Sequence, residues 1–101
     1  MFNFRKRRLR KYFNKYFDYS EVRCLIIRNL SRHKKCVLIN PFVDHKTVFT
    51  LTHIIDDVYI IHIVIFKENN GKVLHEIDFY FEKENKYLSN DIGDVMDFVL
   101  A

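Results

Sequence analysis

The sequence predicts an α+β fold with a basic N-terminal helical segment, an antiparallel β-meander of about four strands and a short C-terminal helix. Apolar side chains recur at helical spacing up to about residue 30, and from residue 36 they alternate with polar ones, as in a strand. The dipeptide Asn70-Gly71 lies between two β-rich runs, which is typical of a tight hairpin. With 101 residues, 49% of them hydrophobic, the chain is expected to form a single domain, 1–101.

The first element is expected to be a basic amphipathic helix over about residues 5–17. Its apolar stripe consists of Leu9, Tyr12, Phe13, Tyr16 and Phe17. We expect this stripe to cover the sheet as part of the core. The alternatives are that it enters an anionic membrane surface or contacts a partner directly.

A second helix is expected to begin after Asp18, because Asp18 and Glu21 form a capping-box pattern. Its buried side would consist of Val22, Leu25, Ile26 and Leu30. The alternative for residues 21–30 is an extra strand, because residues 22–27 are rich in β-branched side chains. Residues 31–35 are polar and basic, and we expect them to form a connector.

Four strands are expected at about 36–40, 47–54, 58–67 and 72–82, with turns at Asp56-Asp57 and Asn70-Gly71. The third is rich in Ile and Val, which is typical of a central strand covered on both faces. Counting from the turns pairs His53 with Ile60, His62 with Phe79 and His75 with Phe66, so that the three histidines share one face. The last helix is expected to begin near residue 89, and Gly93 weakens it.

The charge is divided unevenly between two parts of the chain. Residues 1–35 hold twelve Lys and Arg against two acids, a net charge of +10, whereas residues 36–101 carry a net charge of −6. A basic region of this density is the usual footprint of a polyanion partner. We therefore expect a small non-enzymatic protein that binds nucleic acid, or a nucleic-acid-bound protein machine, through its basic third.

The side chains expected to contact phosphates are Arg5, Arg7, Arg8, Arg10, Lys11 and Lys15, with the patch extended by Arg28, Arg32, Lys34 and Lys35. The sequence contains no base-reading motif, so the contact is expected to be largely independent of nucleic-acid sequence.

A second hypothesis is a protein–protein inhibitor or adaptor that acts through an acidic face or a sheet edge. Asp91, Asp94 and Asp97 recur at a spacing of three on the last helix, and together they could imitate a nucleic-acid backbone. The other interpretation is that they favour the helix N-terminus. A pairing of exposed edge strands would also allow a homodimer.

Enzymatic and metal sites have weaker support. Asp44 and Lys46 flank a histidine in a pattern that some metal-dependent nucleases use, but no further carboxylates can be assigned to such a site. Cys24, His33 and Cys36 match no common zinc spacing, and we expect both cysteines to pack as small apolar residues. A metal or acid–base pair at His53 and His62 is the last alternative. We expect no catalytic residue, no metal and no cofactor.

The composition also suggests a cellular context. Two cysteines and the lack of a long apolar run favour a cytoplasmic protein with reduced thiols. The abundance of Phe, Tyr, Ile, Asn and Lys is typical of an AT-rich coding genome, which is consistent with a phage- or plasmid-encoded regulator or inhibitor of host nucleic-acid machinery.

Overall fold

The computed structural model describes residues 2–101, with side chains from residue 4 onward. The elements in chain order are α1 (Phe2–Tyr16), α2 (Tyr19–His33), β1 (Lys35–Ile39), β2 (His45–Ile55), β3 (Val58–Lys67), β4 (Val73–Glu82) and α3 (Leu88–Leu100). The strands form one antiparallel sheet in the order β1-β2-β3-β4. The predicted α+β class, the four-strand meander and the C-terminal helix are confirmed.

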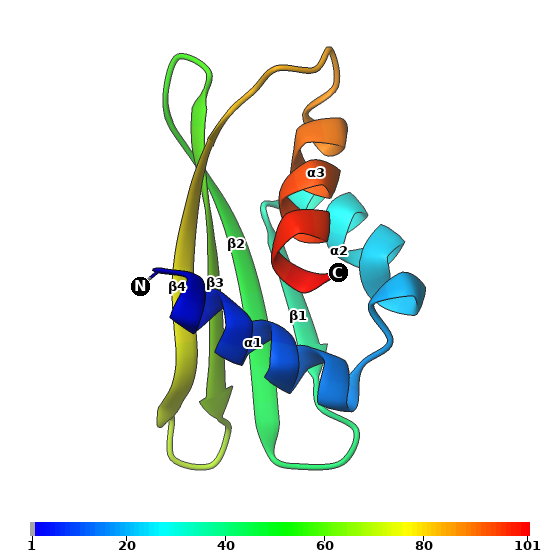
Figure 1. Ribbon diagram of the computed structural model, residues 1–101, viewed down its shortest axis with the longest axis vertical. Coiled ribbons are helices and arrows are strands. Elements are labelled where there is room, and N and C mark those ends of the chain that lie inside the picture. The colour runs from blue at the N-terminus through cyan, green and yellow to red at the C-terminus, as the bar shows by residue number, and fades with distance from the viewer. Residues whose placement is uncertain (1) are drawn as a thin grey trace.

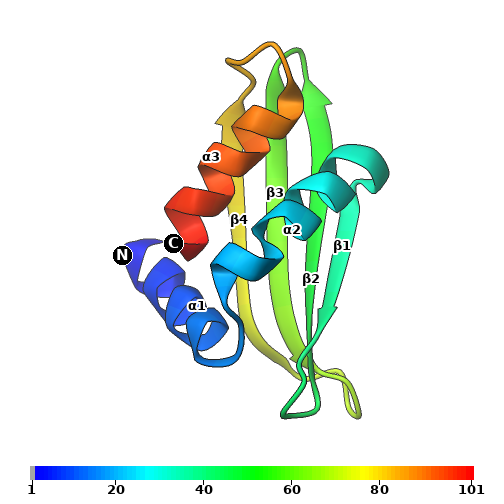
Figure 2. The same ribbon diagram turned by 90° about the vertical axis from the view of Figure 1, so that its right-hand side faces the viewer.

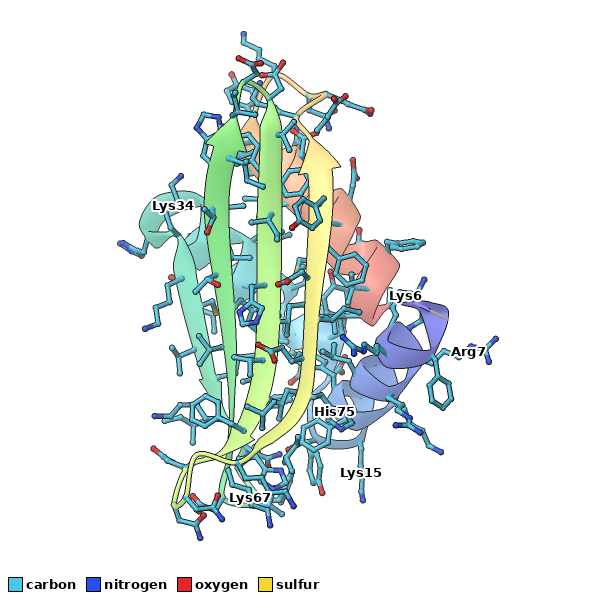
Figure 3. All side chains as sticks on the ribbon, turned by 90° about the vertical axis from the view of Figure 1, so that its left-hand side faces the viewer. Lys6, Arg7, Lys15, Lys34, Lys67 and His75 are labelled. Carbon is cyan, nitrogen blue, oxygen red and sulfur yellow. The ribbon has the colours of Figure 1, made fainter. Side chains whose placement is uncertain are left out.

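All three helices lie on one face of the sheet, which makes a two-layer molecule (Figures 1 and 2). The core lies between the layers, and Phe13, Ile26, Phe49, Ile63 and Met96 are all 0% exposed there. The other face, which we call the open face, carries no helix (Figure 3). The expectation that strand 58–67 is covered on both faces was therefore wrong, because β3 is central but buries only one side.

Two β-bulges change the predicted register. β2 and β3 pair as Ile55 with Val58 next to the turn, but beyond Ile54 the pairing slips and His53 lies opposite Tyr59. A second irregularity at Leu74 lies between the pairs Phe66–Val73 and Ile65–His75. Because side chains alternate between faces, a slip of one residue moves every later side chain to the opposite face.

The predicted histidine face was consequently wrong. His75 pairs with Ile65 on the helix-covered face, whereas His62 pairs with Asp78 on the open face. The Nε2 atom of His62 lies 2.7 Å from a carboxylate oxygen of Glu76. His53 and His62 therefore point to opposite sides of the sheet and cannot bind one metal ion or act as an acid–base pair.

α2 is helical over all of residues 21–30, for which an extra strand was the alternative. The Asp18 carboxylate accepts a hydrogen bond from the Ser20 backbone N–H at 3.1 Å and caps the helix as predicted. The helix ends later than predicted, at His33, where Lys34 adopts a left-handed conformation with φ of 63°. Leu25 is 37% exposed, so the expectation that it is buried was wrong, and Tyr19 is buried instead.

Gly93 has a packing role in α3. A Cβ at this position would lie 3.0 Å from a guanidinium nitrogen of Arg23 and 3.4 Å from Ile27 Cδ1, both on α2. The absence of a side chain at Gly93 thus leaves room for the Arg23 and Ile27 side chains to lie against α3.

Candidate nucleic-acid interface

Helix α1 has a buried side and a charged side. Leu9 is 1% exposed and Phe13 is 0% exposed, while Tyr12, Tyr16 and Phe17 are half-buried. The rings of Phe13 and Phe49 meet edge to face with centroids 6.4 Å apart. The apolar stripe is therefore part of the core, as expected, and the opposite side of α1 faces solvent.

The exposed side of α1 carries five basic side chains, which we call the α1 basic face: Arg5, Arg7, Arg8, Lys11 and Lys15. The ion pairs among the described side chains involve Arg23, Lys46 and His62, so none of them includes α1. Like charges one helical turn apart repel each other. The α1 basic face is therefore a concentrated positive surface without a carboxylate of its own.

Arg10, which was expected among the phosphate contacts, is partly engaged within the fold. Its Nε donates a hydrogen bond to the Val99 carbonyl at 3.2 Å, and Asn14 donates to the Leu100 carbonyl at 3.1 Å. These carbonyls lie in the last turn of α3, where four acceptors lack helical partners and a cation complements the helix dipole. Arg10 and Asn14 thus fasten α1 to the end of α3, where the two helices adjoin (Figure 2).

The other predicted basic side chains lie elsewhere on the molecule. Lys6, Arg7 and Lys15 extend beyond the β4 side of the sheet, whereas Lys34 lies on the β1 side (Figure 3). Arg28 and Arg32 are exposed on the last half of α2 and line a groove of about 690 Å³ between α2 and α3. Lys35 pairs with Thr50 on the open face. The ten predicted residues therefore do not form one extended patch.

The three aspartates of α3 do not form a single exposed face. Asp91 is 5% exposed, and its carboxylate accepts backbone hydrogen bonds from Glu84 at 2.9 Å and Asn85 at 3.2 Å. Burial alone would raise the pKa of Asp91, but the hydrogen bonds from Glu84 and Asn85 outweigh it and leave the pKa below its usual value. Asp94 alone is exposed.

Asp97 joins α3 to α2. Its carboxylate accepts two hydrogen bonds from Arg23, at 2.7 and 3.0 Å, and one from the Tyr19 hydroxyl at 2.6 Å. The Arg23 guanidinium is the main cause of the lowered pKa of Asp97. Burial, followed by the hydrogen bond to Asp97, raises the pKa of Tyr19. The sequence showed the spacing of these aspartates but not their partners.

We expect Asp91→Ala to lower the free energy of unfolding by about 2 kcal/mol, because two backbone N–H groups of the β4–α3 loop lose their charged acceptor. Urea denaturation measures the change. Asp94→Ala is the matched control, since Asp94 is exposed, and should change stability by less than about 0.5 kcal/mol. Equal effects of the two substitutions would contradict the assigned role of Asp91.

A polar cluster lies beneath α1 at the start of β2. Tyr12 shares a short hydrogen bond with His45 Nδ1, and Asn40 donates to the Tyr12 hydroxyl at 3.2 Å. The His75 ring lies with its centroid 5.4 Å from that of Tyr12. Burial, followed by the charges of Arg8 and His45, lowers the pKa of His75 from its usual 6.5.

This lowered pKa makes stability depend on pH. The unfolded chain binds a proton at His75 near pH 6.5, whereas the folded protein resists protonation until a lower pH. Stability should therefore fall as the pH is lowered from about 7.5 to about 5, and His75→Gln should reduce that fall. Urea midpoints at both pH values, with the exposed His53→Gln as control, measure it. An unchanged pH dependence in His75→Gln would contradict the assignment.

The described residues contain no group of three or more His, Cys, Asp or Glu placed to hold a metal ion. Lys46 pairs with Glu68 at 2.9 Å, and the Asp44 carboxylate accepts the Asn69 N–H at 3.1 Å. Asp44 and Lys46 therefore link the β1–β2 hairpin to the β3–β4 hairpin. Cys36 is buried as expected, but Cys24 is exposed, which corrects the expectation that both pack in the core.

The chain matches no protein-family model, no curated protein and no solved structure. No helix within residues 2–101 has the length and apolar character needed to cross a bilayer. The geometry of the described residues is therefore the basis for a functional assignment.

Proposed function

We propose that the protein is a non-enzymatic nucleic-acid-binding protein that contacts phosphates through the α1 basic face. The observation that carries the proposal is that five exposed cationic side chains on one helix form no ion pair with a carboxylate among the described residues. Such a surface is costly through self-repulsion unless an anionic partner relieves it. A phosphate backbone is the partner whose linear charge density suits a helix of this kind.

The burial of Leu9 and Phe13 supports a rigid phosphate-binding surface. Basic side chains on a docked helix lose less freedom on binding than those on a disordered tail, so they bind at lower cost. The same burial weakens the membrane alternative, because α1 would have to leave the core before its apolar stripe entered a bilayer.

The acidic-face alternative has less support. Asp91 and Asp97 already accept hydrogen bonds within the fold, so among the three aspartates Asp94 alone is exposed without a described hydrogen-bond partner. A single carboxylate does not imitate a phosphate backbone. The basic surface remains the better candidate for recognition.

Fluorescence anisotropy with labelled duplex DNA, single-stranded DNA and RNA tests the proposal at low salt. We expect binding to nucleic acids of unrelated sequence with similar affinity, because phosphate contacts carry no sequence information. Polyglutamate of matched charge is the control and should bind more weakly. Binding that is equal for polyglutamate would favour an acidic-protein partner, and no binding to any nucleic acid would refute the proposal.

A further inference from the structure

The open face of the sheet carries an apolar surface that the fold leaves uncovered. Cross-strand pairing arranges its side chains in rows: Ile39–Lys46–Phe66–Val73, Val37–Val48–Val64–Glu76, Lys35–Thr50–His62–Asp78 and Thr52–Ile60–Tyr80. Ile39 is 66% exposed, Val73 50% and Val37 42%. Contiguous apolar patches of this kind on a small domain mark interaction sites.

The charges of this face are arranged asymmetrically. Lys46 is neutralised by Glu68 at 2.9 Å, so the remaining cation is Lys35 on the edge strand β1. The carboxylates of Glu76 and Asp78 lie on the opposite edge strand, β4, beside His62. One edge of the face is therefore positive and the other negative, with valines between them.

We propose that two copies of the chain pair through their open faces, about a two-fold axis parallel to the strands. This rotation places each row of one copy opposite the same row of the other copy, and it sets β1 of one copy against β4 of the other. Lys35 then meets Asp78 of the second copy, and Ile39 meets Val73 of the second copy. A two-fold axis across the strands would instead set β1 against β1 and β4 against β4, which brings edges of like charge together, so the charges select the first arrangement.

Face-to-face packing of this kind is the usual way in which two sheets bury a common surface, with strands aligned to within about 30° and sheets about 10 Å apart. It leaves both helix layers outward and both α1 basic faces exposed. The pairing therefore does not compete with the proposed phosphate contacts, and it stands or falls independently of them.

Sedimentation equilibrium of the full chain tests the pairing. We expect a mass twice the 12.4 kDa of one chain, with concentration-dependent dissociation. Val64→Lys places a charge among the central valines and should raise the dissociation constant by about 30-fold or more. Phe42→Lys is the matched control, because Phe42 is 75% exposed in the β1–β2 loop and outside the sheet, and it should leave the dissociation constant unchanged.

A charge exchange tests the register and remains informative if Val64→Lys fails to fold. Lys35→Glu and Asp78→Lys should each weaken the dimer, and the double variant should restore it. A chain that stays monomeric at the highest soluble concentration would overturn the proposal. It would then indicate that the open face binds a different protein. A dimer that is insensitive to Val64→Lys, or a double variant that is not restored, would equally overturn it.

Discussion

Replacing Phe13 with alanine is expected to lower the free energy of unfolding by about 3–5 kcal/mol, the usual cost of removing a fully buried aromatic side chain. Phe13 is 0% exposed and its ring contacts those of Phe17 and Phe49. The substitution would leave a cavity between α1 and the sheet. Urea denaturation followed by circular dichroism measures the change.

Phe42→Ala is the matched control for this substitution, because Phe42 is the same residue type and is 75% exposed. Its effect should stay within about 0.5 kcal/mol. A loss below about 1 kcal/mol for Phe13→Ala would show that α1 is not part of the core, contrary to the structure. Because α1 supplies core side chains, its deletion would disturb folding as well as binding, and surface substitutions are the cleaner test.

The second large effect is expected for the double variant Arg7→Gln, Lys11→Gln. Both side chains are exposed on the α1 basic face, one helical turn apart. For each tenfold decrease in salt concentration below 1 M, each phosphate contact raises the logarithm (base 10) of the binding constant by about 0.9. Losing two contacts should therefore weaken duplex binding by about 60-fold at about 0.1 M salt. Fluorescence anisotropy measures the affinity.

Lys83→Gln, Lys86→Gln is the matched control, since it removes the same charge from the β4–α3 loop at the far end of the molecule (Figure 1). Its affinity should fall by less than about threefold, because the lost contribution is only the long-range field. Similar losses in both double variants would mean that net charge, and not the α1 basic face, governs binding. Stability of the α1 variant should be unchanged or slightly higher, because self-repulsion on the helix decreases.

The parts of the fold that depend on local signals were predictable from the sequence. Asp18 identified the start of α2, Asn70-Gly71 identified the β3–β4 hairpin, and the spacing of Leu9 and Phe13 identified the buried side of α1. Each of these signals lies within a few residues of the structure it determines, and each has a direct steric or hydrogen-bonding cause.

The register and the site could not be predicted in the same way. The bulge residues Ile54 and Leu74 carry no turn chemistry, yet they place His53 and His75 on the side of the sheet opposite to His62. The contact of Arg10 with the Val99 carbonyl joins residues 89 positions apart. Helix spacing showed which basic residues lie on one side of α1, but only the tertiary packing separates them from Arg28 and Lys34.

The most direct test of the proposed function is the salt dependence of duplex DNA binding by the intact chain. If the α1 basic face contacts phosphates, a plot of log binding constant against log salt should be linear with a slope between about −2.7 and −4.5, which corresponds to roughly three to five contacts. Arg7→Gln, Lys11→Gln should make the slope shallower by about 1.8. A slope near zero, or no binding at low salt, would contradict the central claim.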